Sequence, residues 1–226
     1  MKAPIRDLSK AEILTIHEWR CRHGHTGLVH YNCWRSAQGE PERVGFLDIE
    51  TSNLDADFGI IFSWCIQDEQ GQIVHDIMTK RDLRRRQLDM RVVETCLQEM
   101  KKYDRLVGHY SERFDFPFIR SRALYWGLDS LVPRYGDIVQ TDTWRMAKTL
   151  LKISSNRQEN IARLLLGATG GEPLKTRIDS RHWLSALQGD KEALDYILDH
   201  NIRDVKELKN NYDRLKAFAR QSGKSL

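Results

Sequence analysis

The chain has 226 residues, a formal net charge of +4 and no apolar run that approaches the roughly 18 residues of a membrane-spanning helix. Its first residues lack the apolar core of a secretory signal, and its four cysteines are too few for a disulfide framework in a chain of this length. We therefore expect a cytoplasmic protein with reduced thiols, built around one substantial hydrophobic core.

The first part of the chain, residues 1–40, is expected to be an N-terminal extension. Ser9 and Glu12 have the spacing of a capping box, which predicts a helix that continues to about Arg20.

A segment rich in cysteine and histidine follows, over residues 19–34. Four of its side chains carry the sulfur and nitrogen donors that zinc prefers: Cys21, His25, His30 and Cys33. His23 is an alternative ligand. The spacings match no standard zinc finger closely, so the other interpretation is a polar loop packed by Trp19 and Trp34.

The main body is expected to span residues 41–226 as one domain in which strands and helices alternate. Periodicity predicts strands at about 43–50, 59–67, 73–79, 104–109 and 137–141. It predicts helices at about 89–102, 113–126, 143–152, 158–166, 180–187 and 190–217. Three strands before the first long helix favour a meander, and the later strands favour parallel additions to the same sheet. The expected fold class is α/β, a mixed sheet covered by helices.

The first predicted strand ends with two acids, Asp48 and Glu50. Side chains two residues apart in a strand project from the same face, so these two carboxylates would repel each other. A divalent cation between them would relieve the repulsion, whereas the simpler interpretation is that both are solvated at a strand end.

A third acid, Asp115, lies in RLVGHYSERFDFPFIRSRALYWG, residues 105–127, where an apolar strand leads into a helix. Ser111 is a plausible N-cap, and Asp115 would fall in the first helical turn, where the helix dipole favours an anion. The acid could serve only to stabilise the helix start, but its place between Phe114 and Phe116 makes a solvated role less natural.

A fourth acid, Asp204, lies on the apolar stripe of the strongest predicted helix, seven residues after Ile197 and four before Leu208. His200 is one turn earlier on the same face. A buried carboxylate needs a partner, and a histidine on such a face is commonly a satisfied core residue.

Together, DIET, YSERFDFPFIRSR and HNIRD resemble the three motifs of DEDD-type 3′→5′ exonucleases in the ribonuclease H-like superfamily. The second motif is especially similar to the proofreading domains of family B DNA polymerases and to predicted stand-alone bacterial and phage exonucleases. The resemblance covers about four fifths of the chain. It implies a mixed central sheet flanked by helices, and it implies metal binding by four acids: Asp48, Glu50, Asp115 and Asp204.

Two positions depart from the family pattern. One branch of the family has a tyrosine four residues before the last acid as general base, and the other has a histidine five residues before it. His200 combines the first spacing with the second side chain. We favour it over Tyr196 because an unperturbed imidazole has a pKa near 6.5 and a phenol one near 10. Tyr110 stands where the polymerases commonly have an asparagine that touches the terminal nucleotide.

The implied chemistry is phosphodiester hydrolysis with two divalent ions about 3.5–4 Å apart. Oxygen ligands suit Mg²⁺ or Mn²⁺, with Asp48 expected to bridge both ions and His200 to accept the proton of the attacking water. If bound metal ions neutralise the four acids, the formal charge of the rest of the chain is +8. A positive charge of this size suits binding to a phosphate backbone.

Candidate substrate contacts lie beside the second motif, at Phe114, Arg120 and Arg122, although Phe114 fits a core role equally well. A further basic run comprises Arg81, Arg84, Arg85 and Arg86, and it is also compatible with a solvated face. The expected partner is the 3′ end of single-stranded or frayed DNA, with RNA as an alternative. An endonuclease with the same acids and a catalytically silent nucleic-acid-binding module remain the other hypotheses.

Overall fold

The computed structural model of the chain describes residues 3, 5, 8–21, 24–84, 87–167, 173–174, 178–219 and 224–225. Its centre is a six-stranded mixed sheet in the order β3-β2-β1-β4-β5-β6. The strands are β1 (Val44–Thr51), β2 (Ile61–Asp68), β3 (Ile73–Ile77), β4 (Arg105–Gly108), β5 (Val139–Asp142) and β6 (Lys224–Ser225). The first three strands form an antiparallel meander, β4 and β5 are parallel to β1, and β6 is antiparallel to β5. The expected mixed α/β sheet is confirmed.

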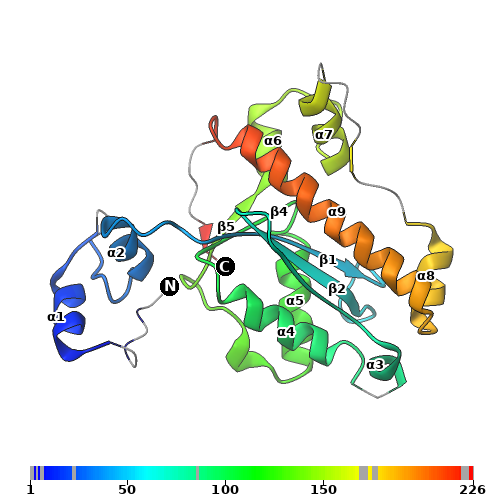
Figure 1. Ribbon diagram of the computed structural model, residues 1–226, viewed down its shortest axis with the longest axis horizontal. Coiled ribbons are helices and arrows are strands. Elements are labelled where there is room, and N and C mark those ends of the chain that lie inside the picture. The colour runs from blue at the N-terminus through cyan, green and yellow to red at the C-terminus, as the bar shows by residue number, and fades with distance from the viewer. Residues whose placement is uncertain are drawn as a thin grey trace.

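Helices cover both faces of the sheet, with α9 across one face and α4 and α5 on the other (Figure 1). They are α1 (Lys10–Glu18), α2 (Tyr31–Ala37), α3 (Lys80–Arg84), α4 (Met90–Met100), α5 (Asp115–Tyr125), α6 (Thr143–Leu150), α7 (Gln158–Leu166), α8 (Ser180–Leu187) and α9 (Lys191–Leu215). A short 3₁₀ helix, η2, spans Asp129–Leu131. Within the described ranges, no helix combines the length and apolarity that crossing a membrane requires.

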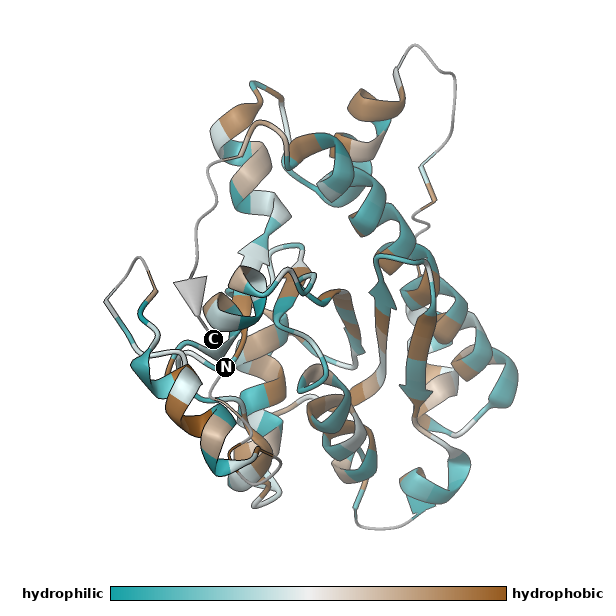
Figure 2. Ribbon diagram, turned by 60° about the vertical axis from the view of Figure 1, so that its left-hand side comes forward, coloured by the Kyte–Doolittle hydropathy of each residue, from teal (hydrophilic) through white to brown (hydrophobic). Residues whose placement is uncertain are grey.

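The core follows from the alternation of side chains along β1. Leu47 and Ile49 pair with Ile66 and Trp64 of β2, and the Trp64 indole donates a hydrogen bond to Thr95 on α4, so this set faces α4. Phe46 points to the opposite face, where its ring lies 5.5 Å from that of Tyr212 on α9. Figure 2 shows hydrophobic segments on central strands and hydrophilic segments over much of the outer helices. β1 and β2 are therefore largely buried on both faces, whereas β3 at the edge is partly exposed.

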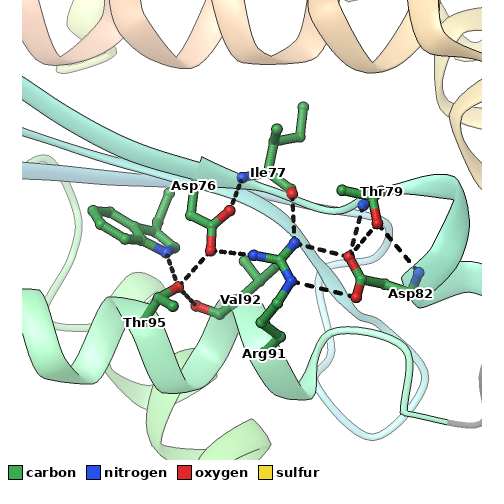
Figure 3. A network of polar contacts seen from close by, with 8 residues as sticks. Asp76, Ile77, Thr79, Asp82, Arg91, Val92 and Thr95 are labelled. Carbon is green, nitrogen blue, oxygen red and sulfur yellow. Dashed lines mark hydrogen bonds and ion pairs between the residues drawn. The ribbon is translucent and has the colours of Figure 1, made fainter.

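A polar network joins β3, α3 and α4 (Figure 3). The Arg91 guanidinium on α4 pairs with Asp76 of β3 and, at 2.8 Å, with Asp82 of α3. Thr79 also donates to Asp82, both from its backbone N–H and from its hydroxyl. Burial alone would raise the pKa of Asp82, but the hydrogen bonds from Arg91 and Thr79 lower it to about 2.

The extension contains α1 and α2 and is connected to the body by a shared carboxylate. Ser9 and Glu12 form the predicted capping box at the start of α1. Asp104, next to β4, pairs at 2.8 Å with Arg35 of α2 and at 2.8 Å with Arg43, just before β1. This one buried acid therefore connects α2 to the end of the sheet where β1 and β4 begin.

Candidate active site

The C-terminal half of β1 carries Asp48 and Glu50 toward α9. They alternate with Leu47 and Ile49, and they share a face with Phe46, whose ring packs on α9. β4 pairs with β1 only at residues 44–46, while β2 pairs along the whole strand. In the described chain, the acidic end of β1 thus projects beyond its parallel neighbour.

Asp115 fills the position that β4 leaves beside β1. It is the first residue of α5 and is 3% exposed, and its Oδ1 accepts a 3.2 Å hydrogen bond from the backbone N–H of Ile49. Ile49 lies between Asp48 and Glu50, so this bond places the third acid beside the first two. The structure differs from the expected N-cap: Phe114 precedes the helix without a side-chain cap, and Ser111 is buried in the preceding turn.

The turn between β4 and α5 is tight and polar. A Cβ added to Gly108 would lie 2.3 Å from Ser111 Oγ, so glycine permits the close reversal. Tyr110 follows in the left-handed region with φ 62°. The Asp142 carboxylate accepts backbone hydrogen bonds from Tyr110, Glu112 and Trp144 at 2.9–3.1 Å. Its pKa is raised because burial outweighs these bonds, which favour the anion.

α9 brings His200 and Asp204 over the same end of β1. His200 Nε2 lies 3.7 Å from Glu50 Oε1 and 3.8 Å from Asp204 Oδ2, and the two α9 side chains are 6% and 2% exposed. One ligand atom from each of Glu50, His200 and Asp204 lies within 4.8 Å of the others. The Gln158 side chain on α7 donates to the Asp204 carbonyl at 2.8 Å, which fixes this turn of α9.

Cys65 on β2 lies directly opposite Asp48 in the β1–β2 register. Burial raises the pKa of its thiol well above the ordinary range, and the charges of Asp48, Glu50 and Asp204 raise it further. The thiol therefore stays protonated. Acids from two distant parts of the sequence, β1 and α9, thus both raise the pKa of this one buried thiol.

Two further polar side chains line this region without a hydrogen-bond partner among the described residues. Ser63 lies opposite Glu50 in the register and shares its face, and Asn201 follows His200 on the sheet-facing side of α9. Both are fully buried. Buried polar atoms of this kind commonly bind water or an ion, so the donor set and its surroundings fit a hydrated divalent cation.

The residues predicted to contact the substrate do not belong to this acidic cluster. Arg122 is 4% exposed and forms a bidentate ion pair with Asp89 at 2.7 and 2.9 Å, so its predicted contact with substrate is not supported. Arg120 is exposed and borders an apolar depression between α4 and α5. The Phe114 ring packs against Phe118 at 5.7 Å and is partly buried on the core. Arg81 and Arg84 lie on α3, whereas Arg85 and Arg86 are outside the described residues.

The RNase H superfamily profile matches residues 45–216, a region that contains the residues of the candidate active site. The chain belongs to the RNase H superfamily. Among solved structures, this RNase H superfamily member matches the family B DNA polymerase from the hyperthermophilic archaeon Pyrobaculum calidifontis with a TM-score of 0.63 and 18% sequence identity. The match covers 79% of this chain and 25% of the polymerase chain, and it shows a shared fold. No match was found among curated protein sequences. The superfamily and the nuclease-type fold expected from the three motifs are thereby confirmed.

Proposed function

We propose that this chain is a divalent-metal-dependent nuclease that hydrolyses phosphodiester bonds from the 3′ end of single-stranded or frayed DNA. The observation that carries the proposal is the convergence of Glu50, His200 and Asp204 within 4.8 Å, beside a strand whose Ile49 amide binds Asp115. These side chains come from β1, α5 and α9, so their meeting is a property of the fold and not of one local segment.

Four carboxylates would hold the metal: Asp48, Glu50, Asp115 and Asp204. Oxygen donors of this kind suit Mg²⁺ or Mn²⁺. When bound, two such ions would activate a water and stabilise the charge on the leaving oxygen. The buried Asn201 and Ser63 side chains provide further polar atoms for water on the α9 side of the sheet.

His200 is proposed to accept the proton of the attacking water at Nε2. Glu50 and Asp204 each have an oxygen within 4 Å of that atom. Two carboxylates at this distance stabilise the imidazolium that forms when the proton arrives.

The approach of a single strand is proposed to follow the cleft that begins at Tyr110, five residues before Asp115. The cleft measures roughly 500 Å³. It is lined by the aromatic residues Tyr110 and Trp144, the cations Arg113, Arg145 and Lys148, the acids Glu112 and Asp142, and Thr149. Tyr110 is 39% exposed, and its ring packs edge-on against Trp144 at 5.3 Å. Aromatic rings beside cations are the usual surface for single-stranded nucleic acid, because every base has a face that can stack.

The catalytic unit is proposed to be residues 41–226, with residues 1–40 as an extension. The matched family region, residues 45–216, lies wholly within the proposed catalytic unit.

The test is an oligonucleotide assay with a 5′ label and either Mg²⁺ or Mn²⁺, on single-stranded DNA, blunt duplex and the same sequence as RNA. We expect a ladder that shortens from the 3′ end, fastest on single-stranded DNA and absent with EDTA. Asp48→Asn should lower kcat by about 10²–10⁴-fold because it removes a carboxylate that would hold the metal.

The matched control is Asp199→Asn, which changes an exposed acid on α9 that pairs with Arg203. It should leave the ladder unchanged. Internal fragments from a circular or 3′-blocked substrate would instead indicate an endonuclease. Binding without any cleavage would indicate a silent nucleic-acid-binding module, and either result overturns the proposal.

A further inference from the structure

The loop between α1 and α2 folds back on itself and gathers cysteine and histidine side chains away from the candidate active site. The Cys21 N–H donates to the His25 carbonyl at 3.0 Å, and Arg20 and Thr26 form an isolated β-bridge. His30 is the N-cap of α2, and Cys33 lies in its first turn. The ends of the loop therefore meet, although 12 positions separate the two cysteines in the sequence.

The sulfur and nitrogen atoms in this loop have the spacing of metal ligands. His30 Nδ1 lies 3.5 Å from Cys21 Sγ and 4.0 Å from Cys33 Sγ. All three ligand atoms lie within 4.8 Å of one another. Zinc bonds of about 2.3 Å to sulfur and about 2.0 Å to nitrogen, set at tetrahedral angles, place the ligand atoms roughly 3.5–3.8 Å apart.

His30 Nδ1 faces both sulfurs, so the two cysteines converge on one ring nitrogen. Thiolate and imidazole ligands of a structural zinc converge on one point in the same way. The four cysteines of the chain are thiols in the structure.

A fourth ligand of the right type is adjacent. The His25 ring lies 4.0 Å from the His30 ring between centroids, tilted by 37°, and its side chain is exposed. Its ring lies beside that of a cluster member, so His25 is the candidate fourth ligand. His23, the other histidine considered as a ligand, lies outside the described residues.

The extension also has little core of its own. α2 contains no buried residue, and α1 buries only Ile16. Helices this short are marginal without further stabilisation, and small modules commonly obtain it from a structural metal.

From these observations we infer that Cys21, His25, His30 and Cys33 form a structural zinc site that holds α1 and α2 together. The inference is independent of the proposed nuclease activity, because it concerns different residues and a different class of metal ligand. Binding would release two thiol protons, since zinc takes cysteine as thiolate.

The test measures zinc in the full-length protein, purified under reducing conditions and dialysed without added metal. We expect about one zinc ion per chain. Cys33→Ser and His30→Ala should lose it, and His25→Ala should release it to a chelator faster than the wild type. Cobalt(II) added to zinc-free wild type should give thiolate charge-transfer absorption and the intense visible bands of tetrahedral coordination.

Three controls separate this site from others. His75→Ala changes an exposed histidine on β3, Cys96→Ala changes a buried thiol, and Asp204→Asn changes the candidate active site. All three should retain zinc. Wild type that carries no zinc and gives only the weak cobalt bands of an all-oxygen site would overturn the inference. So would zinc that is lost in Asp204→Asn and kept in Cys33→Ser. If Cys33→Ser does not fold, the wild-type zinc content and cobalt spectrum still decide.

Discussion

The imidazole of His200 lies between two carboxylates on the buried face of α9. Its Nε2 is 3.7 Å from Glu50 and 3.8 Å from Asp204, and it is shielded from bulk solvent. Tyr196, one turn earlier, instead stacks on His182 of α8 with ring centroids 4.3 Å apart. Of the two candidate bases, His200 is the one whose contacts are with the acids.

His200→Ala is expected to lower kcat by about 10²–10⁴-fold with little change in KM, because it removes the proposed proton acceptor. His200→Tyr should retain part of the activity and move the pH–rate profile toward alkaline pH, since an unperturbed phenol has a pKa near 10 against 6.5 for imidazole. Both are measured with the labelled single strand and with His75→Ala as control. An unchanged kcat in His200→Ala, with weaker Mn²⁺ binding, would instead make His200 a metal ligand.

The orientation of three acids could be predicted from local sequence patterns. Strand alternation places Asp48 and Glu50 on the same face of β1, and helical spacing places Asp204 on the apolar face of α9. Cys65 and Ser63 could not be found in this way. Their nearness to the site depends on the register between β1 and β2, which no local pattern specifies. Arg122 was misjudged for a similar reason, because its partner Asp89 lies 33 positions away and only the tertiary fold brings them together.

At the scale of elements, the junction of β3, α3 and α4 depends on Arg91 and the acids around it. Asp82 has its pKa lowered to about 2, against an ordinary value of about 3.9 in an unfolded chain. A depressed carboxylate pKa stabilises the folded state above the unfolded pKa, and this contribution is lost as the pH falls through the folded pKa. The relevant window for Asp82 therefore runs from about pH 4 down to about pH 2.

Asp82→Asn is expected to lower the free energy of unfolding by about 1 kcal/mol at pH 6, after allowance for solvent screening of a partly exposed pair. The difference from wild type should shrink to about half at pH 3, because wild-type Asp82 is then losing the same contribution. Urea denaturation at both pH values measures it. Asp57→Asn, an exposed loop acid, is the control. A difference that stays constant between pH 6 and pH 3 would contradict this account of Asp82.

The elements themselves were largely predictable from their periodicity. The five predicted strands and the long helices appear within a few positions of their expected limits. α2 and α3 were not predicted. α2 has neither a buried residue nor a side-chain cap, and α3 is a helix of only five residues. β6 has two residues and no pattern to detect. The turn between β4 and α5 was placed correctly, but its polar partner was not. The carboxylate of Asp142, and not the hydroxyl of Ser111, accepts the backbone hydrogen bonds of this turn.

At the scale of the whole molecule, Asp104 connects the extension to the sheet. Burial alone would raise the pKa of its carboxyl, but hydrogen bonds and charge from Arg43 and the charge of Arg35 lower it. The two arginines come from opposite ends of the connector that precedes β1. One carboxylate therefore links the extension directly to the body.

Asp104→Asn is expected to lower the free energy of unfolding by about 3 kcal/mol, because it leaves two guanidinium groups beside a buried neutral amide. It should also increase amide hydrogen exchange in α2. Denaturation and exchange measured by mass spectrometry test both effects. Asp195→Asn breaks an exposed pair with Lys191 and should change stability by less than about 0.5 kcal/mol. Equal midpoints for Asp104→Asn and wild type would show that the link does not stabilise the fold.

The projection of β1 beyond β4 has a consequence for self-association. A strand that extends past its neighbour offers backbone groups to which an extended peptide from a second molecule can add, and such edges promote aggregation. The Ile49 amide lies on that projecting stretch, and Asp115 already occupies it. The carboxylate proposed to hold metal therefore also blocks intermolecular strand addition at the stretch of β1 that has no strand partner on its β4 side within the described chain.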